Sequence, residues 1–209
     1  MLKLAVFVGT RGRGSTLMAL HQAIEDGKLA AQIVAVVGTR RSAPALERAS
    51  AAGLPVVVVN PQKTGEDGYA GALLAALHER GVDTIALAGY MRRLPPEIVA
   101  AYRYRILNTH PALLPSFGGQ GMYGEHVHRA VVEFGAKVSG CTVHFVDEEY
   151  DTGPVIAQRA VVVEENDTPE SLAARILPYE HQAYVESLQW LAEDRLRVEG
   201  RVVRVREAS

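Results

Sequence analysis

Two short segments in the second half of the chain contain the residue types that acyl transfer uses. Asn108 and His110 stand two apart in NTHPALLPSF, residues 108–117, and Asp151 lies in DEEYDTGPVI, residues 147–156. Side chains two apart on a strand share a face, so Asn108 and His110 would point the same way. An amide donor, an imidazole and a carboxylate that orients the imidazole and favours its protonated form suit acyl transfer through a tetrahedral oxyanion.

No activated nucleophile is evident beside these residues. Cys141, the single cysteine, lies in an alternating apolar run, where we expect a packed thiol. His126 and His128 flank one residue at the start of an expected helix, so their side chains would point apart and we expect no metal site. A histidine at a strand end is often structural, and a catalytic role for His110 is favoured only because Asn108 and Asp151 accompany it. The substrate must therefore bring its own nucleophile.

A glycine-rich segment, GTRGRGST at residues 9–16, follows the first expected strand and leads into a helix. Glycines let backbone amides approach a ligand, and a helix N-terminus favours an anion. The spacing of Gly9 and Gly14 resembles a Walker A loop, but Ser15 stands where that motif has lysine, which disfavours nucleoside triphosphate hydrolysis. The segment also lacks the GxGxxG dinucleotide pattern. We expect a phosphate site here, and the alternative is a tight turn without a ligand.

The first half of the chain alternates short apolar runs with helical patterns. Strands are expected at 2–8, 32–38, 54–60, 83–89 and 104–110, and helices near 15–27, 43–52, 66–81 and 95–102. Strands that are apolar on both faces and separated by single helices predict an α/β fold with an open, Rossmann-like, mostly parallel sheet and helices on both faces. The crevice of such a sheet lies beyond the carboxyl ends of its strands, where Asn108 and His110 would stand.

The second half has a different pattern. A helix near 124–135 precedes two alternating runs, 137–147 and 153–164, which we expect to pair as antiparallel additions to the sheet. Asp167 or Thr168 would cap the next helix and Pro169 suits its first turn, but Pro178 should kink or interrupt it. Residues 195–207 predict a terminal hairpin. We expect one domain over 1–209, with a phosphate- or nucleotide-binding half, 1–107, and a catalytic half, 108–209, that also binds the second substrate and carries the terminal hairpin.

Composition narrows the range of partners. The 209 residues are 48% hydrophobic and 22% charged, enough for a sizeable core, and the net charge of -2 with scattered Lys and Arg argues against a nucleic-acid partner. The N-terminal apolar run, residues 4–8, is too short for a signal peptide or a membrane span. One cysteine cannot form an internal disulfide. We therefore expect a cytoplasmic protein without membrane or nucleic-acid partners.

The two catalytic segments resemble the formyltetrahydrofolate-dependent formyltransferases. NTHPALLPSF is similar to their Asn-x-His-Pro segment, and GCTVHFVDEEYDTGPVI, residues 140–156, to their Asp-x-Gly signature. The likeness covers essentially the whole chain. GRGST at 12–16, AGYMRRL at 88–94 and YEHQAY at 179–184 resemble the phosphate loop, the folate-pocket segment and the late Glu-His of members that act on glycinamide ribonucleotide (GAR).

The resemblance implies transfer of a formyl group from the co-substrate 10-formyltetrahydrofolate to the amine of GAR, in the synthesis of purines (IMP). It implies two small-molecule substrates and no metal, and the chain would be a monomer or a homodimer. The catalytic residues would be Asn108, His110 and Asp151. The GAR-binding residues would be Arg11, Gly12, Arg13, Gly14, Ser15, Thr16 and Glu180, the last at the glycyl amine. The folate-binding residues would be Met91, Arg92, Leu94, Val99, His144, Asp147, Glu148 and Asp151. Of these, Met91, Leu94 and Val99 would line the pterin.

The chain departs from the subfamily pattern in three places. Thr16 replaces an asparagine in a phosphate loop that TRGR lengthens, and FGGQGMYGEHVH, residues 117–128, is longer than the typical form. Glu66 and Asp67 stand near where some members carry an arginine for the glutamate tail of the folate. Two alternatives stay open: a formyltetrahydrofolate deformylase-like hydrolase, which would normally carry an extra N-terminal domain, and a non-catalytic phosphate-ligand binding protein. A methionyl-tRNA formyltransferase would need a further C-terminal domain.

Overall fold

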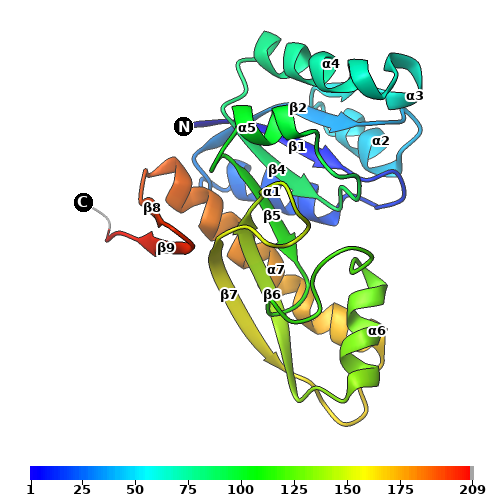
Figure 1. The fold of residues 1–209 in the computed structure, drawn as a ribbon, viewed down its shortest axis with the longest axis vertical. Coiled ribbons are helices and arrows are strands. Elements are labelled where there is room, and N and C mark those ends of the chain that lie inside the picture. Colours follow the sequence, from blue (N-terminus) through cyan, green and yellow to red (C-terminus); the bar gives the residue numbers. More distant parts are fainter. Residues whose placement is uncertain (208–209) are drawn as a thin grey trace. The chain divides into compact units, whose positions relative to one another are not determined.

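The structure is a computed structural model that describes residues 1–207, and the chain forms two compact units (Figure 1). The first unit is Met1–Leu107, and the second begins at Asn108.

The first unit is built on a parallel sheet. Its strands are β1 (Leu2–Val8), β2 (Ala31–Gly38), β3 (Val56–Val58) and β4 (Thr84–Ala88), in the order β3-β2-β1-β4. β1 pairs in parallel with β2 and β4, and β2 pairs in parallel with β3. The interior residues of β1 and β4 are buried, which explains why these strands are apolar on both faces.

Five helices accompany these strands: α1 (Ser15–Glu25), α2 (Pro44–Ala51), α3 (Pro61–Thr64), α4 (Glu66–Glu79) and α5 (Pro96–Ala101). The strand order runs outward from β1 to β3 and then returns to β4. Right-handed crossovers therefore place α1 and α2 on one face of the sheet and α4 on the other. The carboxyl ends of β1 and β4 lie side by side at the point where the order reverses, which is where open α/β sheets bind ligands.

The second unit combines an antiparallel pair of strands with two helices and a hairpin. β5 (Ile106–His110), β6 (Val138–Phe145) and β7 (Val155–Val162) are neighbours in that order, and β6 and β7 pair antiparallel. α6 (Glu125–Phe134) lies between β5 and β6 in the chain, and α7 (Pro169–Ala192) packs against β6 and β7. β8 (Leu196–Glu199) and β9 (Val202–Val205) form the predicted hairpin. The predicted α/β class, with antiparallel additions in the second half, is confirmed.

Pro178 was expected to kink or interrupt the last helix, and the expected interruption is wrong. α7 runs for 24 residues through this proline. Its start is strongly fixed, because Thr168 and Ser171 form a capping box at 3.2 and 2.9 Å and Pro169 follows the cap. An internal proline costs a helix about 3 kcal/mol, and the apolar face that α7 buries, including Ile176 and Leu188, offsets this.

Smaller differences concern the first unit. β3 covers three residues of the expected strand 54–60, and the short α3 was not expected. α3 follows Asn60, whose side chain accepts a hydrogen bond from the backbone N–H of Gln62 at 2.9 Å, and begins at Pro61. This local capping turns the chain into a helix directly after β3. In the part of the chain that the structure describes, no helix is both long enough and apolar enough to span a membrane.

Candidate active site

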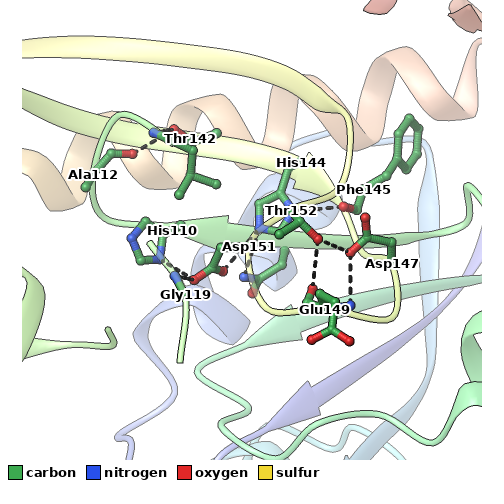
Figure 2. Close-up of polar contacts among 12 residues, drawn as sticks. His110, Ala112, Gly119, Thr142, His144, Phe145, Asp147, Glu149, Asp151 and Thr152 are labelled. Carbon is green, nitrogen blue, oxygen red and sulfur yellow. Dashed lines mark hydrogen bonds and ion pairs between the residues drawn. The ribbon is translucent and has the colours of Figure 1, made fainter. Parts of the chain in front are cut away.

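Four polar side chains meet in the second unit, and we call them the Asp151 cluster: Asn108, His110, His144 and Asp151. Figure 2 shows the carboxylate of Asp151 between the two imidazoles. Oδ2 of Asp151 lies 3.5 Å from Nδ1 of His110, and Oδ1 lies 3.6 Å from Nε2 of His144. Nδ2 of Asn108 lies 3.2 Å from the same Nε2 of His144. The structure thus brings together the three predicted catalytic residues, and His144 lies among them.

The turn between β6 and β7 presents Asp151 through two backbone features. Asp151 has a left-handed φ of 59°, which aspartate tolerates better than most residues. Gly153 passes so close to Phe145 that a Cβ on it would lie 1.8 Å from the Phe145 carbonyl oxygen, so only glycine fits. Asp147 shapes the same turn, because its Oδ1 accepts hydrogen bonds from Thr152 Oγ1 at 2.7 Å and from the backbone N–H of Glu149 at 3.3 Å (Figure 2). The Asp-x-Gly pattern is therefore a structural requirement of the turn.

A β-bulge and a buried threonine place the other members. The register of β6 against β7 shifts between Val143 and His144, and such bulges re-aim the side chain that follows. The hydroxyl of Thr142 donates to the carbonyl of Ala112 at 2.7 Å (Figure 2). It also accepts from the N–H of Leu114 at 3.0 Å. These contacts hold the segment after β5 against β6, which fixes the strand end that carries His110.

Each imidazole of the Asp151 cluster is anchored by a backbone carbonyl. Nε2 of His110 lies 2.8 Å from the oxygen of Phe117, and Nδ1 of His144 lies 2.8 Å from the oxygen of Phe145. Because a carbonyl oxygen only accepts, these two nitrogens carry hydrogens. Nδ1 of His110 and Nε2 of His144 are therefore the ring nitrogens that face Asp151.

Burial and hydrogen bonds set the charges of this cluster. Burial alone would raise the pKa of Asp151, but the neighbouring imidazoles of His144 and His110 and the hydrogen bond from the N–H of Gly119, at 2.9 Å, bring it below its usual value. Burial lowers the pKa of His110, and this outweighs the raising effects of Asp151 and of the Phe117 carbonyl. Asp151 therefore favours the protonated form of His110, as expected, but burial leaves the pKa of His110 below its ordinary value.

Glu180 on α7 is a second carboxyl group with an unusual titration. Burial raises its pKa to about 7, and the Thr109 hydroxyl opposes this shift. Among the described residues the Thr109 hydroxyl has no hydrogen-bond partner, so it acts on Glu180 from nearby without a hydrogen bond to it. Burial also raises the pKa of the Cys141 thiol to about 12, with Glu180 adding to the effect. The expected packed, unreactive thiol at Cys141 is confirmed.

The glycine-rich segment 9–16, which we call the glycine loop, lies in the first unit at the carboxyl end of β1. A Cβ on Gly9 would lie 2.1 Å from the carbonyl oxygen of Gly89, so this glycine allows the loops after β1 and β4 to touch. Gly14 has a φ of 75° and precedes α1. Within residues 1–207 no side chain caps this helix, and its first turn carries no acidic residue. Arg11 and Arg13 are exposed. These features suit an anion at the helix N-terminus.

The segment after β4 contains the remaining predicted residues of the first unit. Leu94 and Val99 are buried, whereas Met91 is 50% exposed. Arg92 forms an ion pair with Glu66, and its guanidinium lies 5.0 Å from the centre of the Tyr69 ring. In the second unit, the predicted folate residues Asp147 and Glu148 lie in the turn between β6 and β7.

The two histidines of α6 differ in their surroundings. His126 is exposed, whereas His128 is buried, and its Nδ1 has no hydrogen-bond partner among the residues that the structure describes. Burial lowers the pKa of His128, and the nearby His110 lowers it further. No group of three or more His, Cys, Asp or Glu in the described part of the chain could hold a metal ion.

Comparisons with known proteins agree on the family. The family model described as formyl transferase matches residues 2–188. A chloroplastic phosphoribosylglycinamide formyltransferase from Arabidopsis thaliana is 46% identical over 197 residues, which are 93% of this chain and 67% of that protein. The chain spans roughly two thirds of the length of the curated plant relatives it matches, 67%, 62% and 64% for the first three.

Solved structures extend this likeness to the whole chain. Glycinamide ribonucleotide transformylase 1 from Symbiobacterium toebii is 40% identical with a TM-score of 0.91, over 99% of this chain and 95% of that one. A formyltetrahydrofolate deformylase from Pseudomonas syringae has a TM-score of 0.85 over 99% of this chain and 67% of that one, but at 24% identity this likeness concerns the fold alone. The resemblance seen in NTHPALLPSF and the Asp-x-Gly turn is confirmed, and the chain belongs to the formyl transferase family.

Proposed function

We propose that the chain transfers the formyl group of 10-formyltetrahydrofolate to the amine of GAR, which gives formylglycinamide ribonucleotide and tetrahydrofolate in purine biosynthesis. The observation that carries this proposal is the Asp151 cluster, in which an amide, two imidazoles and one ionised carboxylate gather without a protein nucleophile. Such a site suits direct transfer to an amine that the substrate supplies. The names of the Arabidopsis and Symbiobacterium proteins support GAR as the acceptor.

The reaction begins when the amine nitrogen of GAR bonds to the formyl carbon. Neutral His110 accepts at Nδ1 the proton that the amine loses, and the adjacent carboxylate of Asp151 stabilises the imidazolium that results. Nδ2 of Asn108 donates to the negative formyl oxygen, an interaction whose loss typically costs about 10²–10³ in kcat. The bond between the formyl carbon and N10 of the folate then breaks, and His110 returns the proton to the departing nitrogen.

Binding of the two substrates is assigned to the remaining predicted residues. The glycine loop, with Arg11, Gly12, Arg13, Gly14, Ser15 and Thr16, holds the phosphate of GAR, and Glu180 meets its glycyl amine. Met91, Arg92, Leu94 and Val99, with the turn from Asp147 to Asp151, hold the folate. The free N–H groups and positive end of α1 support the phosphate assignment. The pKa of about 7 supports a carboxylate at Glu180 that can exchange a proton near neutral pH.

A product assay separates this proposal from its alternatives. The purified chain is incubated with 10-formyltetrahydrofolate, with and without GAR, and formylglycinamide ribonucleotide and formate are quantified. We expect product only when GAR is present, at one equivalent per tetrahydrofolate formed. Formate released at the same rate without GAR would identify a deformylase-like hydrolase. A phosphate-ligand binding protein would release neither product.

A further inference from the structure

Both ring nitrogens of His144 contact other groups of the protein. Its side chain is 2% exposed, its Nδ1 donates to the Phe145 carbonyl at 2.8 Å, and its Nε2 lies 3.2 Å from Nδ2 of Asn108. In the neutral ring a hydrogen on Nδ1 leaves a lone pair on Nε2. The lone pair of an amide nitrogen is delocalised into the carbonyl, so this nitrogen only donates and the hydrogen bond runs from Asn108 to His144. Both ring nitrogens are therefore used inside the protein.

This hydrogen bond determines which end of the Asn108 amide faces the ring. With Nδ2 toward His144, one amide hydrogen is used and the second is free to donate elsewhere. The flipped amide would bring Oδ1 against the lone pair of Nε2, and two acceptors at about 3.2 Å repel one another. A flipped amide would also present an oxygen, instead of an N–H, to any anion at the site. The ring of His144 thus selects the orientation in which Asn108 can stabilise negative charge.

The same ring nitrogen lies beside Asp151. Nε2 is 3.6 Å from Oδ1 of Asp151, while the other carboxylate oxygen faces Nδ1 of His110 at 3.5 Å and accepts the N–H of Gly119 at 2.9 Å (Figure 2). The β-bulge between Val143 and His144 aims the ring into this position. One buried imidazole therefore borders both the amide and the carboxylate of the cluster.

We propose that His144 is a positioning residue for the formyl transfer proposed above, on which this inference rests: it holds the Asn108 amide with its second N–H presented to the formyl oxygen and does not contact either substrate. This role replaces the folate contact that the family resemblance implies for His144. Its effect passes through Asn108, so the two residues act as one unit.

Two substitutions separate the contact of His144 with Phe145 from its contact with Asn108. An asparagine side chain reaches about as far as Nδ1, so His144→Asn keeps the bond to Phe145 and loses the contact with Asn108. A glutamine side chain reaches about as far as Nε2, so His144→Gln can place an oxygen where Asn108 donates. We expect His144→Asn to lower kcat by about 10–100-fold, because most molecules then present the wrong end of the amide. We expect the KM values for GAR and 10-formyltetrahydrofolate to stay within about twofold, and His144→Gln to recover at least half of the loss on a logarithmic scale.

A double-mutant cycle with Asn108→Ala supplies the decisive measurement. Once the amide is absent, His144→Asn has nothing to orient and should lower kcat by less than about twofold further. Additive losses would show that His144 acts independently of Asn108, and a raised KM for the folate with unchanged kcat would show a ligand contact; either result overturns the proposal. His78→Asn, at an exposed histidine on α4, should leave kcat unchanged.

Folding and function are checked separately. Thermal unfolding of each variant identifies any loss of activity that comes from misfolding. If His144→Asn is misfolded, the double-mutant cycle is measured with His144→Gln in its place. If the wild-type chain releases formate instead of formylating GAR, the proposed function fails, but the same cycle read on formate release still tests His144. An active enzyme with additive losses would reject the positioning role alone.

Discussion

In the proposed reaction the Asp151 cluster transfers protons and the glycine loop binds a phosphate, yet the two regions differ in burial and in how their polar groups are held. In the cluster, His110 and His144 are 3% and 2% exposed, and each is anchored by a backbone carbonyl. In the loop, Arg11 and Arg13 are exposed and the first amides of α1 face no capping side chain in the described structure. Groups that move protons are aligned by the protein in advance, whereas groups that bind a phosphate are left for the ligand to satisfy.

Removal of the charge at the centre of the cluster should have the largest effect. Asp151→Asn keeps the size of the side chain but can no longer stabilise an imidazolium at His110, and we expect kcat to fall by about 10²–10⁴-fold. Binding of GAR and of tetrahydrofolate, measured by calorimetry, should change little. Glu165→Gln removes an exposed carboxylate of the same unit and should keep full activity. Full turnover in the Asp151→Asn enzyme would remove this carboxylate from the mechanism.

Glu180 offers a test through pH. Its pKa of about 7 means that the carboxylate forms only as the pH rises through neutrality. We expect kcat/KM for GAR to rise with pH through this range, by about tenfold, and the rise to disappear in Glu180→Gln. Glu186→Gln, on the same helix, should keep it.

The same shift makes a prediction about stability. Because the pKa of Glu180 is raised from its usual 4.5 to about 7, the folded state binds this proton more tightly than the unfolded state. The free energy of unfolding therefore falls as the pH rises from about 4.5 to 7. Glu180→Gln should remove this loss, so we expect a higher Tm than wild type at pH 8 and a smaller difference at pH 4.5. Equal Tm differences at the two pH values would contradict the burial of this carboxyl.

Local features of the Asp151 cluster could be predicted from the sequence, whereas features that depend on the whole fold could not. The spacing of Asn108 and His110 at a strand end, and the pairing of Asp151 with Gly153 in a turn, are local patterns, so they indicated the cluster directly. The position of His144 depends on a register shift against β7, where one extra residue of β7 lies opposite the step from Val143 to His144, and the alternating sequence does not reveal it. The net pKa shift of His110 depends on burial by the whole fold, which outweighs the neighbouring carboxylate.

The fold followed the same division. The alternation of apolar strands and helical segments predicted the α/β class and the antiparallel pair, because hydrophobic periodicity is set residue by residue. Continuity of α7 through Pro178 was missed, since it depends on the apolar face that the helix buries against β6 and β7 rather than on the local preference of proline. Capping by Thr168, a purely local feature, was predicted correctly.

A Cβ added at Gly14 of the glycine loop should affect GAR binding through crowding against Ala45 more than through backbone strain. A Cβ at Gly14 would lie 3.1 and 3.3 Å from Cβ and Cα of Ala45, and Gly14 has a φ of 75°. We expect Gly14→Ala to displace the start of α1 and to raise the KM for GAR by about tenfold, or 1.4 kcal/mol, with kcat within about threefold of wild type. Gly27→Ala is a matched control at the other end of α1, because its φ of 72° carries the same strain and no other group within residues 1–207 approaches within 4 Å. An equal rise of KM in both variants would attribute the effect to strain in α1.

The smallest expected effect lies at the ion pair between Glu66 and Arg92, in which both side chains are partly exposed. If Arg92 helps to bind a folate carboxylate, as proposed, Glu66 competes with that ligand for the guanidinium. Exposed ion pairs contribute about 0–1 kcal/mol, so Glu66→Gln should tighten tetrahydrofolate binding by no more than about fivefold. Tetrahydropteroate lacks the glutamate and should bind both proteins equally, and Asp67→Asn, which removes the neighbouring exposed charge, should have a weaker effect. The gain should also shrink in high salt, because an exposed pair is screened; a gain shared equally by tetrahydropteroate would instead place the effect of Glu66 on the pterin.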